Sequence, residues 1–323
     1  KLARLPFGPV LRCLGLRGVP SSVLFAPARV FAVLPVVARA CLGPRRSPLV
    51  GCCVWAGAFW PHWGFPGEGP AVERVAAAQS VWLLSANVTS LASRTGWLTA
   101  AHESWVGVSC LQETHLDARV GFRVSRALRS RGISSLHSNL EAAPLPALDG
   151  ASRQAQGTCV CASDGRGLGA VAVAPPPVAA WSRRVAFARL SLWHGGPQVC
   201  VASVYGVSQS GKVARRVANE DLLEWTVGVL VSQPLPWVLA GDINQDSAAV
   251  PALVAAQRAG LGSDVAALWP DAAEPTFWSA RGHGSRIDCV WVSRGLLPHV
   301  SAARVVDMGL PGHRGVAVQF RGL

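Results

Sequence analysis

The chain has 323 residues, and half of them are hydrophobic, so it can bury the core of one large domain or two small ones. Its 30 Lys and Arg residues against 18 Asp and Glu residues give a net charge of +12. This composition excludes an acidic or weakly hydrophobic disordered protein. The charge is uneven: residues 1–78 carry 9 basic and 2 acidic residues, and residues 79–323 carry 21 and 16. The resulting +5 on the larger part is compatible with a polyanionic partner and equally with a solvated basic surface.

The first 78 residues differ in composition from the rest. They are rich in Pro, Gly, Arg and Trp and have no sustained periodicity, so we predict a poorly ordered extension. The apolar run 23–42 is interrupted by prolines and arginines, which argues against a transmembrane helix. A basic targeting segment is one alternative, and we favour an unstructured extension or a part of a longer parent protein. Without a convincing signal peptide or membrane segment, we expect an intracellular protein, nuclear or cytoplasmic.

The cysteines support the same compartment. Nine are present, with no CxxC pair and no Cys/His zinc spacing, which excludes a disulfide framework and a zinc finger. Most cysteines beyond residue 100 fall within apolar, strand-like runs, where free cysteines act as small hydrophobic residues. The odd count weakly favours a reducing compartment.

Residues 79–323 are predicted to form one α+β domain. In chain order we predict strand 81–87, helix 89–104, strand 106–113, helix 116–131, strands 132–138, 157–161, 169–174, 185–193 and 199–205, helix 212–232, strand 237–242, helix 248–259, and strands 286–293 and 316–320. Many short strands with few helices indicate two packed sheets covered by outer helices.

The string Gly241-Asp242-Ile243-Asn244 follows the buried strand 237–242. If the backbone stays extended, Asp242 and Asn244 point the same way, because side chains alternate between the two faces of a strand. A carboxylate and a carboxamide aimed at one point suit a hydrated Mg²⁺ and a phosphate. Taken alone, the string fits an ordinary turn equally well.

Five further polar signals lie at the ends of predicted strands, and only their order is distinctive. They are Asn87, the run Gln112-Glu113-Thr114, the single tyrosine Tyr205, the run Arg286-Ile287-Asp288, and the run Gly312-His313-Arg314 before the last strand. Each alone has a plainer interpretation as a turn, core or surface residue.

This ordered series resembles the endonuclease/exonuclease/phosphatase superfamily, which has the DNase I-like fold. The resemblance covers about residues 80–321 and looks closest to the endonuclease domains beside reverse transcriptases in non-LTR retrotransposons, which are similar to apurinic/apyrimidinic endonucleases. It implies a four-layer sandwich of two mostly antiparallel sheets flanked by helices. It also implies a DNA-nicking phosphodiester hydrolase that uses Mg²⁺, with Mn²⁺ as the alternative. DNA and a reverse-transcriptase domain of the same parent polyprotein are the implied partners, and no membrane is implied.

The resemblance also assigns roles to the metal-binding residues. Glu113 is the implied main Mg²⁺ ligand, because a hard cation prefers carboxylate oxygen. Asn87 is expected to hold the metal site or to orient neighbouring carboxylates. Asp242 is expected to contact the metal site and to orient or deprotonate the attacking water.

The remaining implied residues act on the phosphate and the proton. Asn244 is expected to donate to the scissile phosphate, and Tyr205 to contact the phosphate or position the water. His313 is the implied phosphate-binding or acid/base imidazole. Asp288 is expected to orient that imidazole and raise its pKa.

One departure from the family pattern concerns the residues before His313. The family usually has Ser-Asp there, whereas this chain has Pro311-Gly312. The lost carboxylate predicts altered metal binding. Two alternatives therefore stand beside the endonuclease: a phosphatase of the same fold acting on small phosphoesters, and a catalytically degenerate copy.

Overall fold

A computed structural model describes residues 80–142, 156–163, 165–193, 196–208, 213–279, 281–310 and 312–322. All of them belong to the second of two compact units of the chain, residues 71–323. The predicted extension of residues 1–78 lies outside the described residues, so its lack of order and its boundary stay predictions.

The described strands form two six-stranded sheets and one short hairpin. The first sheet has the order β13-β14-β1-β2-β4-β3 and the second β5-β6-β7-β8-β12-β9. The strands of the first sheet are β1 (Ser80–Asn87), β2 (Val106–Gln112), β3 (Ile133–His137), β4 (Thr158–Ser163), β13 (Val300–Val306) and β14 (Gly315–Arg321). Those of the second are β5 (Gly169–Ala170), β6 (Val185–Ser191), β7 (Gln198–Tyr205), β8 (Trp237–Asp242), β9 (Gly262–Asp264) and β12 (Asp288–Ser293). The hairpin pairs β10 (Phe277–Trp278) with β11 (Gly284–Ser285).

Each sheet contains one parallel pair near its centre, and every other described pairing is antiparallel. β1 runs parallel to β2, and β7 runs parallel to β8. A parallel connection needs a crossover, and helices provide it here: α4 (Thr95–Ser104) leads from β1 to β2, and α6 (Val213–Ser232) leads from β7 to β8. Because parallel strands end at the same edge of a sheet, each pair delivers two strand ends to one edge.

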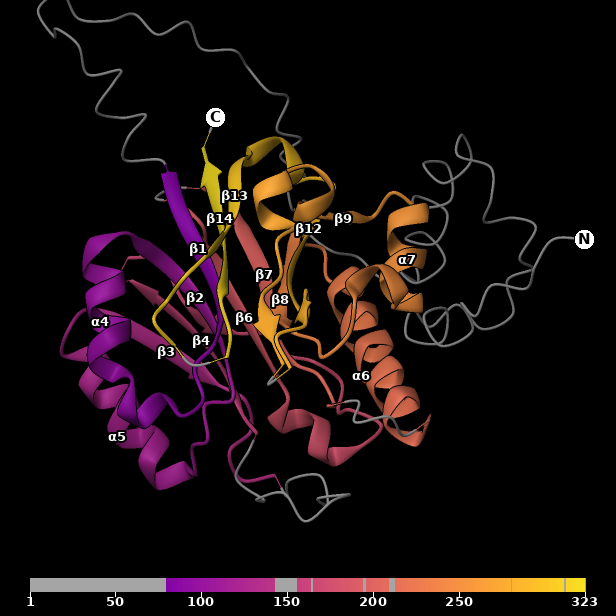
Figure 1. The fold of residues 1–323 in the computed structure, drawn as a ribbon. Coiled ribbons are helices and arrows are strands. Elements are labelled where there is room, and N and C mark those ends of the chain that lie inside the picture. The colour runs from indigo at the N-terminus through magenta and orange to yellow at the C-terminus, as the bar shows by residue number, and fades with distance from the viewer. Residues whose placement is uncertain are drawn as a thin grey trace, which may run out of the picture. The chain divides into compact units, whose positions relative to one another are not determined.

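The layers follow from where the apolar side chains lie. One apolar core fills the space between the sheets and includes Leu83, Val108, Val201 and Val238. Two outer cores pack the opposite faces of the sheets against helices, α4 and α5 (Ala118–Arg129) on the first sheet and α6 and α7 (Pro251–Arg258) on the second (Figure 1). Strands buried on both faces read as continuous apolar runs, which explains why β2 and β8 contain few polar residues.

Short 3-10 turns complete the described chain at Leu91–Ser93, Ala179–Arg183, Ser247–Ala249, Val265–Ala267, Pro270–Ala272 and Leu297–His299. α5 begins at a defined residue, because the Asp117 side chain accepts a hydrogen bond of 2.7 Å from the Val120 N–H and thereby caps the helix. In the part of the chain that the structure describes, no helix combines the length and hydrophobicity needed to cross a membrane.

The predicted four-layer sandwich is confirmed, and the differences lie at its edges. The strand expected at 169–174 has only two residues, and that expected at 286–293 begins at Asp288. The edge strand β13 was not predicted. Its residues are only partly buried and include two alanines and Arg304, so its sequence lacks the strong apolar signal of a central strand.

Candidate active site

Polar ends of central strands from both sheets meet at one edge of the sandwich. Asn87 ends β1, Asp242 ends β8, and Asp288 begins β12 directly opposite Asp242 in the antiparallel register. The Asn87 Nδ2 atom donates a hydrogen bond of 3.0 Å to Asp242 Oδ2 and so joins the two sheets. All three side chains are buried. The structure therefore brings together residues that lie 155 and 46 positions apart in the sequence.

His313 completes this cluster from the loop before β14. Its Nδ1 atom lies 3.2 Å from Asp288 Oδ2 and 4.0 Å from Asp242 Oδ2. The ring packs against Phe277 at 4.9 Å between centroids, and the two residues form an isolated β-bridge. Backbone pairing and ring packing fix the imidazole beside the carboxylates.

Asp288 is itself held by Thr276, whose role was not predicted. The Thr276 hydroxyl oxygen accepts hydrogen bonds from the backbone N–H groups of Ile287, at 3.2 Å, and Asp288, at 3.0 Å. These bonds fix the point at which β12 begins. The run Pro275-Thr276-Phe277-Trp278 was visible in the sequence, but nothing in it showed that Thr276 contacts the strand.

Gly241 allows β8 to pass very close to β7. A Cβ atom at this position would lie 2.0 Å from the Val204 carbonyl oxygen, which no side chain can tolerate. The glycine of the motif therefore has a packing role, and it sets the position of Asp242 one residue later.

The interpretation of Asp242 and Asn244 as neighbours on an extended strand is wrong in one respect. The Asn244 backbone is left-handed, with φ of 55°, a conformation that asparagine adopts more readily than most residues. Its backbone N–H donates to Asp242 Oδ1 at 3.0 Å, and its side-chain amide donates to the Gly206 carbonyl at 3.1 Å. The turn therefore orients the Asp242 carboxylate through the backbone of Asn244, and a side-chain contact of Asn244 with phosphate stays a prediction.

Glu113 and Tyr205 form a second pair beside the cluster. The Tyr205 hydroxyl donates a hydrogen bond of 2.5 Å to Glu113 Oε1. Glu113 directly follows β2 and has φ of 52°, a strained value for a residue of this type. His115, which was not predicted, places its Nε2 atom 3.9 Å from the second Glu113 oxygen. A histidine two residues after a strand-end glutamate was the only sequence signal for it.

Arg184 is a further residue whose place the sequence did not indicate. Its side chain is buried, although an arginine is usually a surface residue. Its guanidinium lies over the Tyr205 ring at 5.0 Å and donates to the carbonyls of Tyr205, at 3.2 Å, and Gly206, at 2.6 Å. These hydrogen bonds fix the backbone at the end of β7.

Burial and mutual charge shift the acid–base properties of the cluster. Burial, with the charge of Asp288, raises the pKa of Asp242 to about 7, and burial also raises that of Asp288. Burial lowers the pKa of His313, but its hydrogen bond to Asp288 and the charges of Asp288 and Asp242 outweigh this and raise it. Burial and Glu113 raise the pKa of Tyr205 well above its usual range, so the hydroxyl stays protonated. Two buried carboxylates so close together need a proton or a cation between them.

The donor set fits a divalent cation. Asp242, Asp288 and His313 each offer one ligand atom, and these atoms lie within 4.8 Å of one another. Within the described part of the chain, Asp288 Oδ1 is buried and meets no donor in hydrogen-bond geometry, so this hard oxygen is available as a ligand. Glu113, the expected main ligand, is not in this group of three, although its charge acts on Asp288 and His313. Gly312 has φ of 80° and adds no carboxylate.

Both ends of the Asn87 side-chain amide are hydrogen-bonded. Its Nδ2 atom orients Asp242, while its Oδ1 atom accepts a hydrogen bond of 3.2 Å from the Thr89 N–H. The amide is thus used to fix a carboxylate.

The sequence matches the endonuclease/exonuclease/phosphatase family over residues 83–309. The chain belongs to this family. The match takes in every site residue described above except His313, which follows it. Family members typically depend on divalent metals, in agreement with the donor set of the cluster. No curated protein sequence matches the chain.

Solved structures share the fold at low sequence identity. A 3′-5′ exonuclease from Neisseria meningitidis is 18% identical, with a TM-score of 0.55, and covers 75% of this chain and 100% of its own. An apurinic/apyrimidinic endonuclease from Leishmania major is 19% identical, with a TM-score of 0.56, over 76% and 89%. The endonuclease domain of the telomere-specific non-LTR retrotransposon TRAS1 is 14% identical, with a TM-score of 0.50, over 75% and 98%. These likenesses confirm the DNase I-like fold.

Proposed function

We propose that this family member is a metal-dependent phosphodiester hydrolase that nicks DNA, as the endonucleases of non-LTR retrotransposons do. The observation that best supports this is the cluster of Asp242, Asp288 and His313, joined to the other sheet through Asn87. Hydrolysis of a phosphodiester needs an activated water, compensation of charge on the phosphoryl oxygens and protonation of the leaving oxygen. Asp242, a cation held by the carboxylates, and His313 are candidates for these three tasks.

A bound Mg²⁺ or Mn²⁺ would act as a Lewis acid on the phosphoryl oxygens. The carboxylates of Asp242 and Asp288 would hold it, because a hard cation prefers oxygen ligands. Asp242 is also suited to orient the attacking water, because two hydrogen bonds fix its carboxylate.

His313 is suited to contact the phosphate, and Tyr205 acts beside it through Glu113. Since His313 Nδ1 faces Asp288, a proton on Nε2 is directed away from that carboxylate and can be donated to a phosphate oxygen. The Tyr205 hydroxyl stays protonated and holds Glu113, which keeps a negative charge close to the imidazole.

A basic helix that follows Glu113 in the chain favours DNA over a small phosphoester. α5 begins five residues after Glu113, and it exposes four arginines, Arg119, Arg123, Arg126 and Arg129. The helix itself contains no acidic residue. A row of cations on one helix suits the regular charges of a nucleic-acid backbone.

The test is nicking of supercoiled plasmid by the purified full chain, with Mg²⁺, with Mn²⁺ and with EDTA. We expect nicking that requires metal and that His313→Ala reduces at least about 100-fold, since general acid–base groups contribute about 10² to 10⁴. His299→Ala is the control: this half-buried histidine bonds the Arg321 carbonyl and stacks on Trp193, at the end of β14 away from His313. Plasmid that stays intact over a wide range of both metals would refute the proposal.

A catalytically silent DNA-binding copy is the second candidate, and Gly312 favours it because a carboxylate is missing there. Plasmid binding without nicking would identify this candidate. Release of phosphate from inositol phosphates, with plasmid left intact, would instead identify a phosphatase of the same fold.

A further inference from the structure

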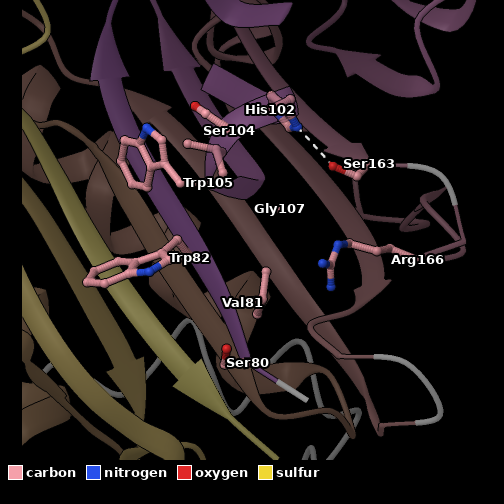
Figure 2. Close-up of a pocket in the computed structure, with 10 residues that line it drawn as sticks. Ser80, Val81, Trp82, His102, Ser104, Trp105, Gly107, Ser163 and Arg166 are labelled. Atoms are coloured by element: carbon pink, nitrogen blue, oxygen red, sulfur yellow. Dashed lines mark hydrogen bonds between the residues drawn. The ribbon is translucent and has the colours of Figure 1, made fainter. Parts of the chain in front are cut away.

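A cavity of about 420 Å³ lies at the other end of β1 from the catalytic cluster (Figure 2). Ser80, the first residue of β1, lines it, whereas Asn87, the last, belongs to the cluster. At about 3.3 Å per residue, the two ends of the strand are roughly 23 Å apart. The cavity is therefore a separate site, and its volume lies in the range of about 300–1,000 Å³ usual for small ligands.

One wall of the cavity carries the positive charge of Arg166, which has no acidic partner among the described residues. The Arg166 Nη1 atom donates to the Leu192 carbonyl, and the Nε atom is buried with no partner. Burial lowers the pKa of this guanidinium, and no carboxylate among the described residues contacts it. A charge withdrawn from water without a counter-ion is costly, so an anion bound here would recover that cost.

Gly107 makes room for this charge. A Cβ atom at Gly107 would lie 2.7 Å from Arg166 Nη2 and 2.2 Å from a Val81 methyl group. Any larger residue would displace the guanidinium or the start of β1. The glycine thus opens the rim of the sheet where the pairing of β1 with β2 changes register, between Trp82 and Leu83.

The opposite wall is aromatic. Trp82 and Trp105 pack edge to face with their ring centroids 6.0 Å apart, and Trp105 is 37% exposed. Figure 2 shows both indoles on one side of Val81 and Gly107 and the Arg166 guanidinium on the other. A flat ring can stack on an indole, and this contact gains about 1–3 kcal/mol for a nucleobase.

Neutral polar groups lie between the two walls. The His102 ring nitrogens lie 3.1 Å from the Ser163 hydroxyl and 3.0 Å from the Ser109 hydroxyl. Burial and the nearby Arg166 charge lower the pKa of His102 to about 4, so the ring is neutral at pH 7. The cavity therefore offers one cation, Arg166, and neutral hydrogen-bonding groups. This combination suits an anion with one or two negative charges.

We propose that this cavity binds a nucleoside monophosphate, with its phosphate on Arg166 and its base against Trp105. An anionic group and a flat ring joined by a short linker match the cationic and aromatic walls on the two sides of Gly107. The inference rests on the cavity alone and is independent of the activity proposed for the catalytic cluster.

Isothermal titration calorimetry of the full chain with AMP, adenosine and inorganic phosphate tests the proposal. AMP should bind more tightly than either fragment, because only AMP contacts both walls. Arg166→Gln should weaken AMP binding at least about tenfold through loss of a charge-assisted hydrogen bond. Arg258→Gln, the matched control at an exposed arginine of α7, should leave it unchanged. Trp105→Leu should weaken AMP binding and leave phosphate binding unchanged.

Three outcomes would overturn the proposal: no heat with AMP, equal binding of phosphate and AMP, or loss of AMP binding in His313→Ala with retention in Arg166→Gln. The last would place the nucleotide in the catalytic cluster. Circular dichroism verifies that each variant is folded, and Trp105→Leu decides alone if Arg166→Gln is not. The nicking activity plays no part in this test, so failure of one proposal leaves the other standing.

Discussion

Asp242→Asn is expected to stabilise the metal-free protein while it abolishes hydrolysis. The pKa of Asp242 rises from 3.8 to about 7 on folding. At 1.36 kcal/mol for each pKa unit, ionised Asp242 costs the folded state about 4 kcal/mol above pH 7. An uncharged amide of the same shape avoids this cost. The new amide at position 242 faces the Asn87 amide, however. A mismatched hydrogen bond between the two amides would reduce the gain in stability by about 1 kcal/mol or more. The net gain expected at pH 8 is therefore about 1–3 kcal/mol.

The sign of the pH dependence is part of the prediction. A carboxyl whose pKa is raised by folding destabilises the protein as it ionises, so the cost is small below pH 4 and complete above pH 7. The gain from Asp242→Asn should therefore shrink between pH 8 and pH 5. Urea unfolding in EDTA at the two pH values measures it, and plasmid nicking with Mg²⁺ measures the lost activity.

Asp264→Asn is the matched control. Asp264 is also buried, but its carboxylate is paired with Arg286 at 2.5 Å. Removal of one partner of a buried ion pair typically costs about 3–5 kcal/mol, so this substitution should destabilise the protein at pH 8. If Asp242→Asn lowers the stability of the metal-free protein at pH 8 as Asp264→Asn does, the electrostatic account of the cluster is wrong.

Three further predictions concern other parts of the fold. Tyr205→Phe removes the donor to Glu113 and should slow nicking about tenfold or more, with a change of unfolding free energy of only about 1 kcal/mol; unchanged nicking would contradict a role for this pair. Gly241→Ala should destabilise the protein by about 3 kcal/mol or more in urea, because its Cβ would collide with a backbone carbonyl, whereas Gly228→Ala, in open space on α6, should be neutral or stabilising. His102 has its pKa lowered from 6.5 to about 4, so the stability it supports is complete above pH 6.5 and lost as the pH falls to 4. His102→Gln should flatten the dependence of unfolding free energy on pH in this window by about 1.4 kcal/mol per pH unit, and an unaltered slope would refute the shift.

The sequence predicted the fold and the members of the candidate site better than their contacts. Strand ends are marked by a switch from apolar to polar residues, which is why Asn87, Asp242 and Asp288 could be identified and expected at one edge. Their meeting follows from topology, because the two parallel pairs end at the same edge of their sheets. The switch from apolar to polar residues at a strand end can be seen in the sequence alone, without knowledge of how the strands pack.

What could not be predicted depends on three-dimensional surroundings. The left-handed turn at Asn244 depends on the Gly206 carbonyl, 38 residues earlier. The burial of Arg184 depends on the Tyr205 ring, over which its guanidinium lies, and on carbonyls at the end of β7. β13 was missed because an edge strand is half exposed and lacks a sustained apolar pattern. For Asn244 and Arg184, a contact with a residue that is distant in sequence decides the local structure.

The place of β14 in the first sheet has a consequence for biosynthesis. This strand is the last of the described chain, yet it pairs with β1, the first, and lies between β1 and β13. His313 immediately precedes it. A ribosome therefore releases almost the whole domain before the sheet can close and before the imidazole can reach Asp288. A nascent or prematurely terminated chain lacks both, so an enzyme of the proposed kind would be unable to cut DNA until its synthesis had passed this strand.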